Sequence, residues 1–364
     1  MKSHHFDKKE FLFFLKRGCL FVVLLIGAYY GPQIAVERFG GLYSDRVQAA
    51  ATPETFGNTK EEKGNEEEAL VSVSNGKEEM IRLGFVGDMM FDRGVESHIL
   101  RYGGGNQDFP FEKIQAYLKT FDVLFGNLEG PVSDKGADEG SVYSFRMSPA
   151  VALALARAGF SVVSVANNHI GDFGKEAMTD TFRRLDDASI VYSGGGKTSA
   201  EAYNPKVMSV RGTRISFLAF SEFGKNYLEA KDFEAGIALI SRESLQTSIA
   251  LAKEVSDVVV VSFHFGDEYE PEPNDYQKET ARLAIDLGAD IVVGHHPHVV
   301  EPLERYKEGY IAYSLGNFIF DQNFSQETME GAVLEVLLRG TRIADVKLTP
   351  IRINTHFQPE LLAP

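Results

Sequence analysis

The stretch Ile291-Val-Val-Gly-His-His-Pro-His298 contains three of the protein's nine histidines. Its β-branched residues predict a buried strand, which the chain leaves at Gly294. Because Pro297 fixes the backbone of the turn, His296 and His298 can point into one crevice. Imidazole is the commonest metal ligand near neutral pH, so the stretch predicts a transition-metal site at a strand end. A polar loop with incidental histidines is the alternative.

Polar side chains also follow other predicted strands. The segments 81–86, 121–125, 161–165 and 258–263 each end at residues that can bind a metal. Predicted helices, such as the one over 276–287, separate several of them, which is typical of βαβ units and a largely parallel sheet. Ligands bind such sheets outside the carboxyl ends of the strands. The residues that we expect to meet there are Asp88, Asn127, Glu129, Asn168, His169, His264, His296 and His298.

Length and composition limit the remaining possibilities. A chain of 364 residues suits one large α/β domain, or two smaller ones, with appendages. Residues 332–355 alternate between apolar and polar side chains, which predicts antiparallel strands completing a second sheet. The formal net charge of -15 argues against nucleic acid as a partner, because phosphate contacts need clustered Lys and Arg. The single cysteine, Cys19, lies in an N-terminal apolar segment, so the globular part has no disulfide.

The N-terminal region predicts a membrane anchor. Residues 1–17 carry an excess of Lys and Arg, and residues 18–36 carry no charge over about the length that spans a bilayer. Because the basic flank comes first, we expect a single-pass helix with a cytoplasmic N-terminal tail and the main domain outside. A cleaved signal peptide is the alternative, with Val47-Gln-Ala49 as its small-residue site. The acidic residues 37–80 predict a flexible, disordered linker, and the domain follows at 81–358.

The predicted cluster contains enough ligands for two adjacent metal ions, since it offers two carboxylates, two asparagine oxygens and at least three imidazoles. Such a set suits divalent Mn, Fe or Zn better than Ca. A two-metal site lowers the pKa of a bridging water and binds the oxygens of an in-line displacement at phosphorus. The candidate ligands are Asp88, Glu129, Asn168, His264, His296 and His298, with Glu129 the best residue to bridge both ions. The candidate catalytic residues are His169, which could protonate a leaving alkoxide, and its neighbour Asn168.

Seven further residues could support the ligands or contact the substrate. These residues are Asn127, Asn167, Asp172, His295, Glu268, Arg146 and Asn317. Structural interpretations remain open for several candidates, because Asp88 could form a turn and Arg146 a surface ion pair. Asn167 and Asn168 could cap a helix. Other hydrolase signatures, such as Gly-x-Ser-x-Gly and His-Glu-x-x-His, are missing from the sequence.

These residues lie in segments that resemble the bacterial capsule-synthesis CapA family, which is associated with poly-γ-glutamate production. The similarity covers roughly residues 81–355, in the family's order, and Phe265 stands where the family commonly has Trp. The segments that carry it are Gly87-Asp-Met-Met90, Asn127-Leu-Glu129, Ala166-Asn-Asn-His-Ile-Gly-Asp172, His264-Phe-Gly-Asp-Glu-Tyr269, Gly288-Ala-Asp-Ile-Val-Val-Gly-His-His-Pro-His298 and Tyr313-Ser-Leu-Gly-Asn-Phe-Ile-Phe-Asp321.

The family is in turn similar to the calcineurin-like metallophosphoesterases, which implies a four-layer α/β/β/α sandwich. Asp88, Asn168-His169, His264 and His296-Pro-His298 match the metal-binding motifs of those enzymes in order. Two positions depart from the pattern. Met90 stands where an Asp-x-His motif has its histidine, and Asn127-Leu-Glu129 replaces a Gly-Asp motif. An altered metal site or a different catalytic role therefore stays open.

The resemblance implies a function at the bacterial cell membrane. We expect an extracytoplasmic, metal-dependent hydrolase, with phosphoesters as substrate class, in the synthesis or export of capsule or poly-γ-glutamate. The alternative is a non-catalytic subunit that binds polymer or serves as a scaffold in a membrane poly-γ-glutamate synthase. Expected partners are an envelope polymer or phosphoester, the membrane and other synthase subunits. An acidic domain would need a basic groove or a bridging metal to hold an anionic polymer.

Overall fold

The computed structural model describes residues 80–224 and 227–362. The predicted tail at 1–17, the apolar segment at 18–36 and all of the predicted linker except residue 80 lie outside these residues. No helix in the described part is long and apolar enough to cross a membrane.

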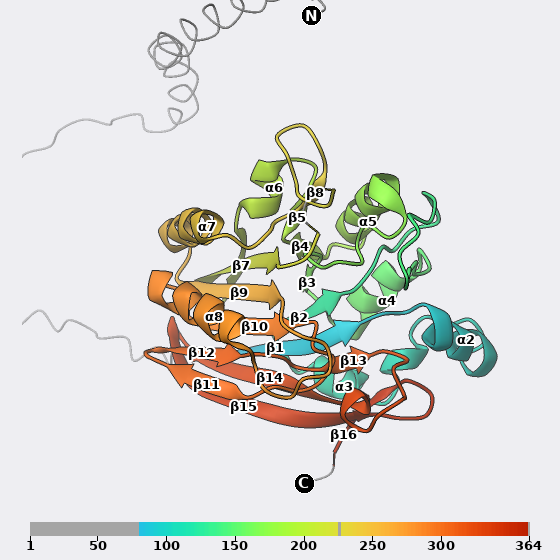
Figure 1. Ribbon diagram of the computed structural model, residues 1–364. Helices are drawn as coiled ribbons and strands as arrows, with labels where there is room; N and C mark the ends of the chain where they lie inside the picture. Colours follow the sequence, from blue (N-terminus) through green and yellow to red (C-terminus); the bar gives the residue numbers. More distant parts are fainter. Residues whose placement is uncertain (1–79, 225–226, 363–364) are drawn as a thin grey trace, which may run out of the picture. The chain divides into compact units, whose positions relative to one another are not determined.

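Two β-sheets form the centre of the fold (Figure 1). The first sheet consists, in its order across the sheet, of β16 (Pro359–Leu361), β15 (Arg342–Ile353), β14 (Glu330–Arg339), β1 (Met80–Met89), β2 (Val123–Leu128), β3 (Val162–Ser164) and β4 (Val191–Ser193). A further strand, β13 (Asn317–Ile319), pairs with β1. The neighbours from β1 to β4 are parallel, whereas β14, β15 and β16 pair antiparallel.

The second sheet also has a parallel centre. Its strands are, in order, β11 (Leu303–Tyr306), β12 (Gly309–Ala312), β10 (Ile291–His295), β9 (Val258–His264), β7 (Thr213–Ser221) and β6 (Lys206–Val210). The four central strands are parallel, and the two edge strands are antiparallel to their neighbours. A short pair, β5 (Gly195–Gly196) and β8 (Gly236–Ile237), forms a separate sheet.

The central strands are buried on both faces, which explains their runs of β-branched residues. In β9, Val258 and Val260 pack in a core that also contains Phe85 of β1, so this core lies between the two sheets. Val259 and Val261 point the other way, into a core that they share with helices. Successive side chains of a strand alternate between faces, so one strand contributes to both cores.

Helices cover the outer face of each sheet. The core outside the first sheet contains residues of α2 (Arg93–Tyr102), α3 (Gln115–Leu118), α4 (Val151–Ala158) and α5 (Gly174–Asp187). The core outside the second sheet contains residues of α6 (Ser199–Tyr203), α7 (Arg242–Val255) and α8 (Asp275–Leu287), and Figure 1 shows α7 and α8 together on this side. Two 3₁₀ helices span Phe109–Phe111 and Glu327–Met329. The predicted mixed α/β fold is confirmed.

The helix before the histidine stretch has clear end signals. At the start of α8, Asn274 accepts a hydrogen bond from the backbone N–H of Gln277, and the Gln277 side chain bonds back to the cap. Gly288 ends the helix with φ 114°, a left-handed conformation that favours glycine. The chain therefore turns sharply into β10, which carries the histidines to the site.

One sequence prediction about the sheets is wrong. Residues 332–355 do form antiparallel strands, β14 and β15, but these strands belong to the first sheet, because β14 pairs with β1. Ala332, Leu334, Val336 and Leu338 pack between the two sheets. Alternation shows that one face of a strand is buried, but it does not show which neighbour the strand will pair with.

Candidate metal centre

The polar residues predicted from the sequence meet where parallel strands end. Asp88 lies near the end of β1, and its partner in the strand register is Asn127 of β2. His264 ends β9, and its partner in the register is His295, which ends β10. Because β1 belongs to the first sheet and β9 and β10 belong to the second, the site lies between the two sheets.

Asp88 is fully buried and contacts groups from both sheets. Its Oδ1 accepts a 2.8 Å hydrogen bond from Asn127 Nδ2, and its Oδ2 accepts one of 3.1 Å from the backbone N–H of His296. His295 Nδ1 lies 3.3 Å from Oδ1, and His298 Nδ1 lies 3.4 Å from Oδ2. Burial acts to raise the pKa of Asp88, but the hydrogen bonds and charges of His295 and His298 hold this pKa well below its usual range.

Glu129 is also fully buried, and one of its oxygens has no hydrogen-bond partner in the described part of the chain. Its Oε2 accepts a 3.2 Å hydrogen bond from Asn127 Nδ2. This oxygen, Oε1, lies 3.7 Å from His298 Nε2 and 3.9 Å from His169 Nε2. Burial, and then the charge of Asp88, raise the pKa of Glu129 well above its usual range. A buried carboxylate of this kind is costly unless a cation binds it.

The turn after β10 holds two histidines in a strained backbone. His296 has φ 99° and His298 has φ 60°, both in the left-handed region that non-glycine residues rarely adopt. The ring centroid of His296 lies 4.8 Å from that of His264, and its buried Nδ1 has no hydrogen-bond partner among residues 80–224 and 227–362. His298 Nδ1 lies 3.0 Å from Asn317 Oδ1. Backbone strain of this kind clusters at binding sites.

The histidines differ in their charge states. Burial, and then the positive charge of His298, lower the pKa of His296 to about 3. Burial and the charge of His296 likewise lower the pKa of His264 well below its usual range. Burial opposes the charged form of His298 too, but Glu129 and Asp88 raise its pKa to about 9. A metal binds neutral imidazole, so His264 and His296 are in the right form at neutral pH, while His298 would release a proton.

Among the residues that the structure describes, the possible ligand atoms fall into two groups, and within each group they lie within 4.8 Å of one another. The inner group is Asp88, Glu129 and His264, all buried, and the outer group is the exposed Glu268 with the buried His296 and His298. Each group includes a residue with a buried atom that lacks a hydrogen-bond partner in the described ranges, Glu129 with Oε1 or His296 with Nδ1. Carboxylate oxygens with imidazole nitrogens suit Mn, Fe or Zn. The residues present therefore fit one ion in each group.

Asn168 contacts the inner group through its amide. Its Oδ1 lies 2.7 Å from His264 Nε2, so the oxygen predicted as a ligand lies beside one of the other candidate ligands. Glu268, which the sequence suggests only as a supporting residue, lies within the outer group itself.

His169 lies between a carboxylate and a cavity. Its Nδ1 lies 2.7 Å from Asp172 Oδ2, and an ionised carboxylate can only accept, so Nδ1 carries a proton. Nε2 faces Glu129 Oε1 at 3.9 Å. The imidazole packs on Phe145, with 4.1 Å between ring centroids, and the Phe145 backbone N–H also donates to Asp172. These contacts fix both the tautomer and the orientation of His169.

Three asparagines connect the ligands to the backbone. Asn127 Nδ2 reaches Asp88 and Glu129, and its Oδ1 accepts a 3.1 Å hydrogen bond from Asn167 Nδ2. Asn167 also donates to a backbone carbonyl and accepts from the backbone N–H groups of residues 169 and 170, which shapes the turn after β3. Asn317 Nδ2 donates to Gln322 Oε1 and to a backbone carbonyl, so its oxygen stays directed at His298.

Two predicted supporting residues are placed differently from the others. His295 is buried, and while its Nδ1 faces Asp88, its Nε2 has no hydrogen-bond partner in the part of the chain that the structure describes. Arg146 is exposed, and its guanidinium lies 4.3 Å from the ring centroid of Phe173. It is not among the residues that line the cavity beside the site, so the structure does not bring it to the ligands.

A cavity of about 200 Å³ opens beside His169, Glu268 and His298. None of its other lining residues is among the site residues predicted from the sequence: Arg93, Tyr143, Phe145, Tyr269, Asp321, Gln322 and Phe324. Asp321 binds the guanidinium of Arg93 through both carboxylate oxygens. Tyr269 and Asp321 lie inside the family-like segments, which could have drawn attention to them, but no sequence pattern marks the others.

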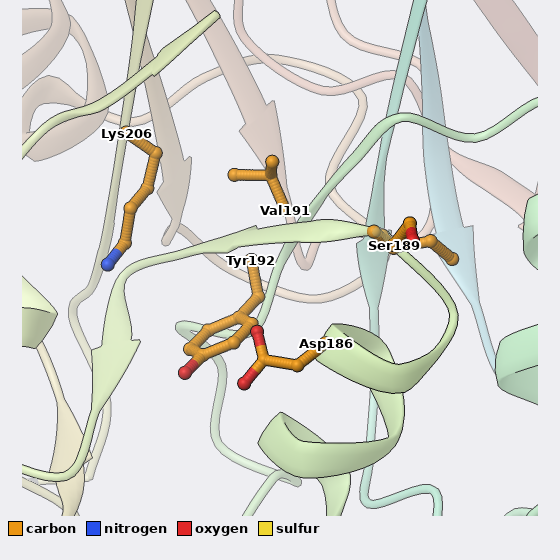
Figure 2. Close-up of a pocket in the computed structure, with 6 residues that line it drawn as sticks. Asp186, Ser189, Val191, Tyr192 and Lys206 are labelled. Atoms are coloured by element: carbon orange, nitrogen blue, oxygen red, sulfur yellow. The ribbon is translucent and has the colours of Figure 1, made fainter.

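A second cavity, of about 290 Å³, lies where β4 begins, away from the carboxyl ends of the strands (Figure 2). Asp186 reaches it from the last turn of α5, Tyr192 from β4 and Lys206 from β6. The Lys206 ammonium lies 5.6 Å from the ring centroid of Tyr192. Burial lowers the pKa of Lys206 and raises that of Tyr192 to about 12.

Solved structures with a similar backbone fold include two phosphoesterases. A phosphatase from Mycoplasma pneumoniae is 12% identical, with a TM-score of 0.46, over 75% of this chain and 94% of that one. The calcineurin-like phosphoesterase YfkN from Bacillus subtilis is 15% identical, with a TM-score of 0.42, over 74% of this chain and 90% of that one.

The sequence comparisons give the family. The capsule biosynthesis protein CapA of Bacillus anthracis is 34% identical over 79% of this chain and 71% of its own length. The PGA biosynthesis protein CapA of Bacillus subtilis is 33% identical over 78% of this chain and 74% of its own length. The profile of the family described as "Bacterial capsule synthesis protein PGA_cap" matches residues 82–322, which contain every candidate ligand. The chain therefore belongs to the bacterial capsule synthesis protein family.

Proposed function

We propose that this protein is a metal-dependent phosphoester hydrolase that holds two divalent ions between its sheets. The observation that carries the proposal is that each of two adjacent groups of possible ligands includes a residue with a buried side-chain atom that lacks a hydrogen-bond partner in the described ranges, Glu129 with Oε1 or His296 with Nδ1. The residues that would hold the ions are Asp88, Glu129, Asn168 and His264 for one, and Glu268, His296 and His298 for the other. Bound ions of this kind activate a water and stabilise negative charge on phosphoryl oxygens.

His169 is the proposed general acid. Its Nδ1 is held by Asp172, and the ring lines the cavity where the alcohol part of an ester would lie. When charged, its Nε2 can donate a proton to the leaving oxygen, which forms the alcohol. The contact with Phe145 keeps the ring from rotating away, so the proton is delivered from one fixed position.

The setting that we propose is the outer side of the bacterial cell membrane, during capsule or poly-γ-glutamate synthesis or export. The family and the names of the relatives in two Bacillus species support this setting. Residues 18–36 would be the anchor, by the pattern of charge and hydropathy in the sequence. Protease treatment of intact protoplasts tests this placement, because an external domain is digested while the cytoplasmic tail is protected.

A polymer-binding or scaffold subunit of a membrane synthase is the second candidate, and the position of Met90 favours it. Met90 is buried in the core outside the first sheet, so the place of a motif histidine contributes no imidazole to the site. Glu268 in the outer group adds a ligand that can offset this loss. The acidic residues near the cavity, Glu268 and Asp321, also disfavour a purely electrostatic site for an anionic polymer.

Metal content and hydrolysis, measured on the full-length protein purified without chelators, test the two candidates together. We expect about two transition-metal ions per chain and a phosphomonoesterase activity that a chelator removes and Mn²⁺ restores. His296→Ala should lower both, while His356→Ala, which changes a histidine outside both ligand groups, should change neither. Bound metal without any hydrolysis would favour the scaffold, and a protein that binds no metal even after reloading would overturn the hydrolase.

A further inference from the structure

Exposed aromatic rings are concentrated at the cavity beside the outer ligand group. Tyr143, Tyr269 and Phe324 all line it, and they remain 66%, 42% and 64% exposed. The ring of Phe324 meets that of Tyr269 edge-on, with 5.1 Å between centroids. Single exposed apolar residues are ordinary on a protein surface, but several around one cavity mark a binding site.

The charges around the cavity exclude a strongly anionic occupant of its outer part. Glu268 and Asp321 contribute two carboxylates to the lining. Arg93 is the one Lys or Arg among the lining residues that the structure describes, and Asp321 already binds its guanidinium. Negative charge on a ligand would therefore be favourable only toward the divalent ions of the proposed metal centre, and the part that reaches outward should be neutral.

The polar end and the aromatic end are close enough for one small molecule. His169 and His298 line the same cavity as Tyr143, Tyr269 and Phe324. The ring of Tyr269 also lies nearly parallel to that of His298, at 6.1 Å and 28°. A phosphoryl group at the histidines would place the alcohol part of its ester among the aromatic side chains.

We propose that the substrate is a phosphomonoester whose alcohol carries a neutral ring, and that Tyr143, Tyr269 and Phe324 bind this ring. This inference rests on the proposed hydrolase function. In the reaction, the oxygen of water bonds to phosphorus and the bond between phosphorus and the alcohol oxygen breaks. The alcohol oxygen takes a proton from His169, water supplies a proton in return, and the products are inorganic phosphate and the ring-bearing alcohol. An aromatic ring and a sugar ring both present flat apolar faces to such side chains.

Three esters of primary alcohols separate the possibilities, because their leaving groups are similar in reactivity. Benzyl phosphate carries an aromatic ring, glucose 6-phosphate carries a sugar ring, and glycerol 3-phosphate has an open chain. With the Mn²⁺-loaded full-length protein, we expect kcat/KM for at least one ring ester to exceed that for glycerol 3-phosphate by about tenfold. Whichever ring ester is preferred identifies the ring as aromatic or saccharide.

Two variants and a binding measurement complete the experiment. Phe324→Ala and Tyr143→Ala, at exposed positions, should each reduce the preference for the ring ester by several-fold. Phe233→Ala is the matched control, since Phe233 is a fully exposed aromatic that does not line the cavity. Calorimetry should show benzylphosphonate or glucose 6-phosphonate binding more tightly than an open-chain phosphonate, in a manner that depends on Phe324.

The outcomes separate this inference from the hydrolase proposal. Equal hydrolysis of all three esters, unchanged by Phe324→Ala, would overturn the ring-binding role and leave the hydrolase intact. If no ester were hydrolysed although metal is bound, the hydrolase would fail, and the phosphonate affinities would then decide the ring-binding role alone.

Discussion

The two cavities differ less in size than in what is buried around them. The larger one, at the start of β4, is lined by charged groups such as Asp186 and Lys206. None of its lining residues has a buried side-chain atom without a hydrogen-bond partner, within the described ranges. The smaller one is lined by Glu268 and His298 of the outer ligand group and by His169, whose Nε2 faces Glu129 Oε1, a buried atom without a hydrogen-bond partner in the described ranges. Volume alone therefore does not identify the functional site, whereas unpaired buried ligand atoms at strand ends do.

The largest expected effect is that of replacing Asp88 in the candidate metal centre, compared with replacing Asp186 in the second cavity. Asp88→Asn should remove bound metal and all measurable hydrolysis, because Asp88 contacts Asn127, His295, His296 and His298 at once. Even loss of a ligand's hydrogen-bond partner typically costs about 10- to 100-fold. Elemental analysis and phosphate release measure the two effects.

The matched variant is Asp186→Asn, which changes an exposed carboxylate of the other cavity. Its metal content and its activity should stay within about twofold of the wild type, as for an ordinary surface substitution. If Asp186→Asn were as damaging as Asp88→Asn, the distinction between the two cavities would be wrong.

A smaller loss should follow from removing the proposed acid. His169→Ala should lower kcat by about 10²- to 10⁴-fold with metal content retained, since the His169 ring belongs to neither ligand group. Asp172→Asn should lower kcat less, because it disturbs the tautomer and leaves the imidazole in place. Single-turnover kinetics with elemental analysis of the same samples would show this. Loss of metal from His169→Ala would instead assign this residue to the ligand set.

The sequence predicts which residues meet at the candidate metal centre more reliably than it predicts which strands pair with one another. Asp88, Asn127 and His264 follow from one physical rule, that parallel strands bring their carboxyl ends to one edge. The alternating pattern predicts a second sheet for β14, which instead pairs with β1, because alternation carries no information about the neighbouring strand. The mixed α/β fold was predictable from strands separated by helical segments.

Other features of the site depend on tertiary structure alone. The sequence predicts only a supporting role for Glu268, because nothing in its sequence neighbourhood shows that its loop returns to His296 and His298. The backbone hydrogen bond from Tyr269 N–H to the Pro297 carbonyl, 2.8 Å long, holds that loop against the histidine turn. Tyr143 and Phe324 lie in loops that are far apart in the sequence, so no local sequence pattern predicts that they line the same cavity.

Glu301 tests whether an unpaired buried carboxylate is by itself a metal site. It is 1% exposed, Oε2 accepts from Gln277 Nε2 at 2.8 Å, and Oε1 has no hydrogen-bond partner in the described ranges, yet it belongs to neither ligand group. Glu301→Gln should therefore leave metal content unchanged. A fall in bound metal would extend the site to this residue.

The same variant should change how stability depends on pH. Burial raises the pKa of Glu301 to about 7. The folded state then binds more protons than the unfolded state between the ordinary glutamate pKa and pH 7, so the free energy of unfolding falls as pH rises through this window. Glutamine does not titrate, so the Glu301→Gln variant does not lose free energy of unfolding in this way as pH rises. Thermal unfolding at pH 5 and pH 8 should show Glu301→Gln stabilised by about 1 kcal/mol at the higher pH only.

The smallest expected effect is at the second cavity, where Lys206→Met should leave hydrolysis within about twofold of the wild type. Burial lowers the pKa of Lys206, so the folded state disfavours its charged form, and the contact with Tyr192 offsets part of this penalty. The penalty is present at neutral pH and disappears as pH rises through the lowered pKa toward the ordinary lysine value. Lys206→Met should therefore raise the free energy of unfolding by less than about 1 kcal/mol at pH 7, with a smaller gain near pH 10. Denaturant unfolding at both pH values measures the difference, and a large loss of hydrolysis in this variant would assign a catalytic or binding role to the second cavity.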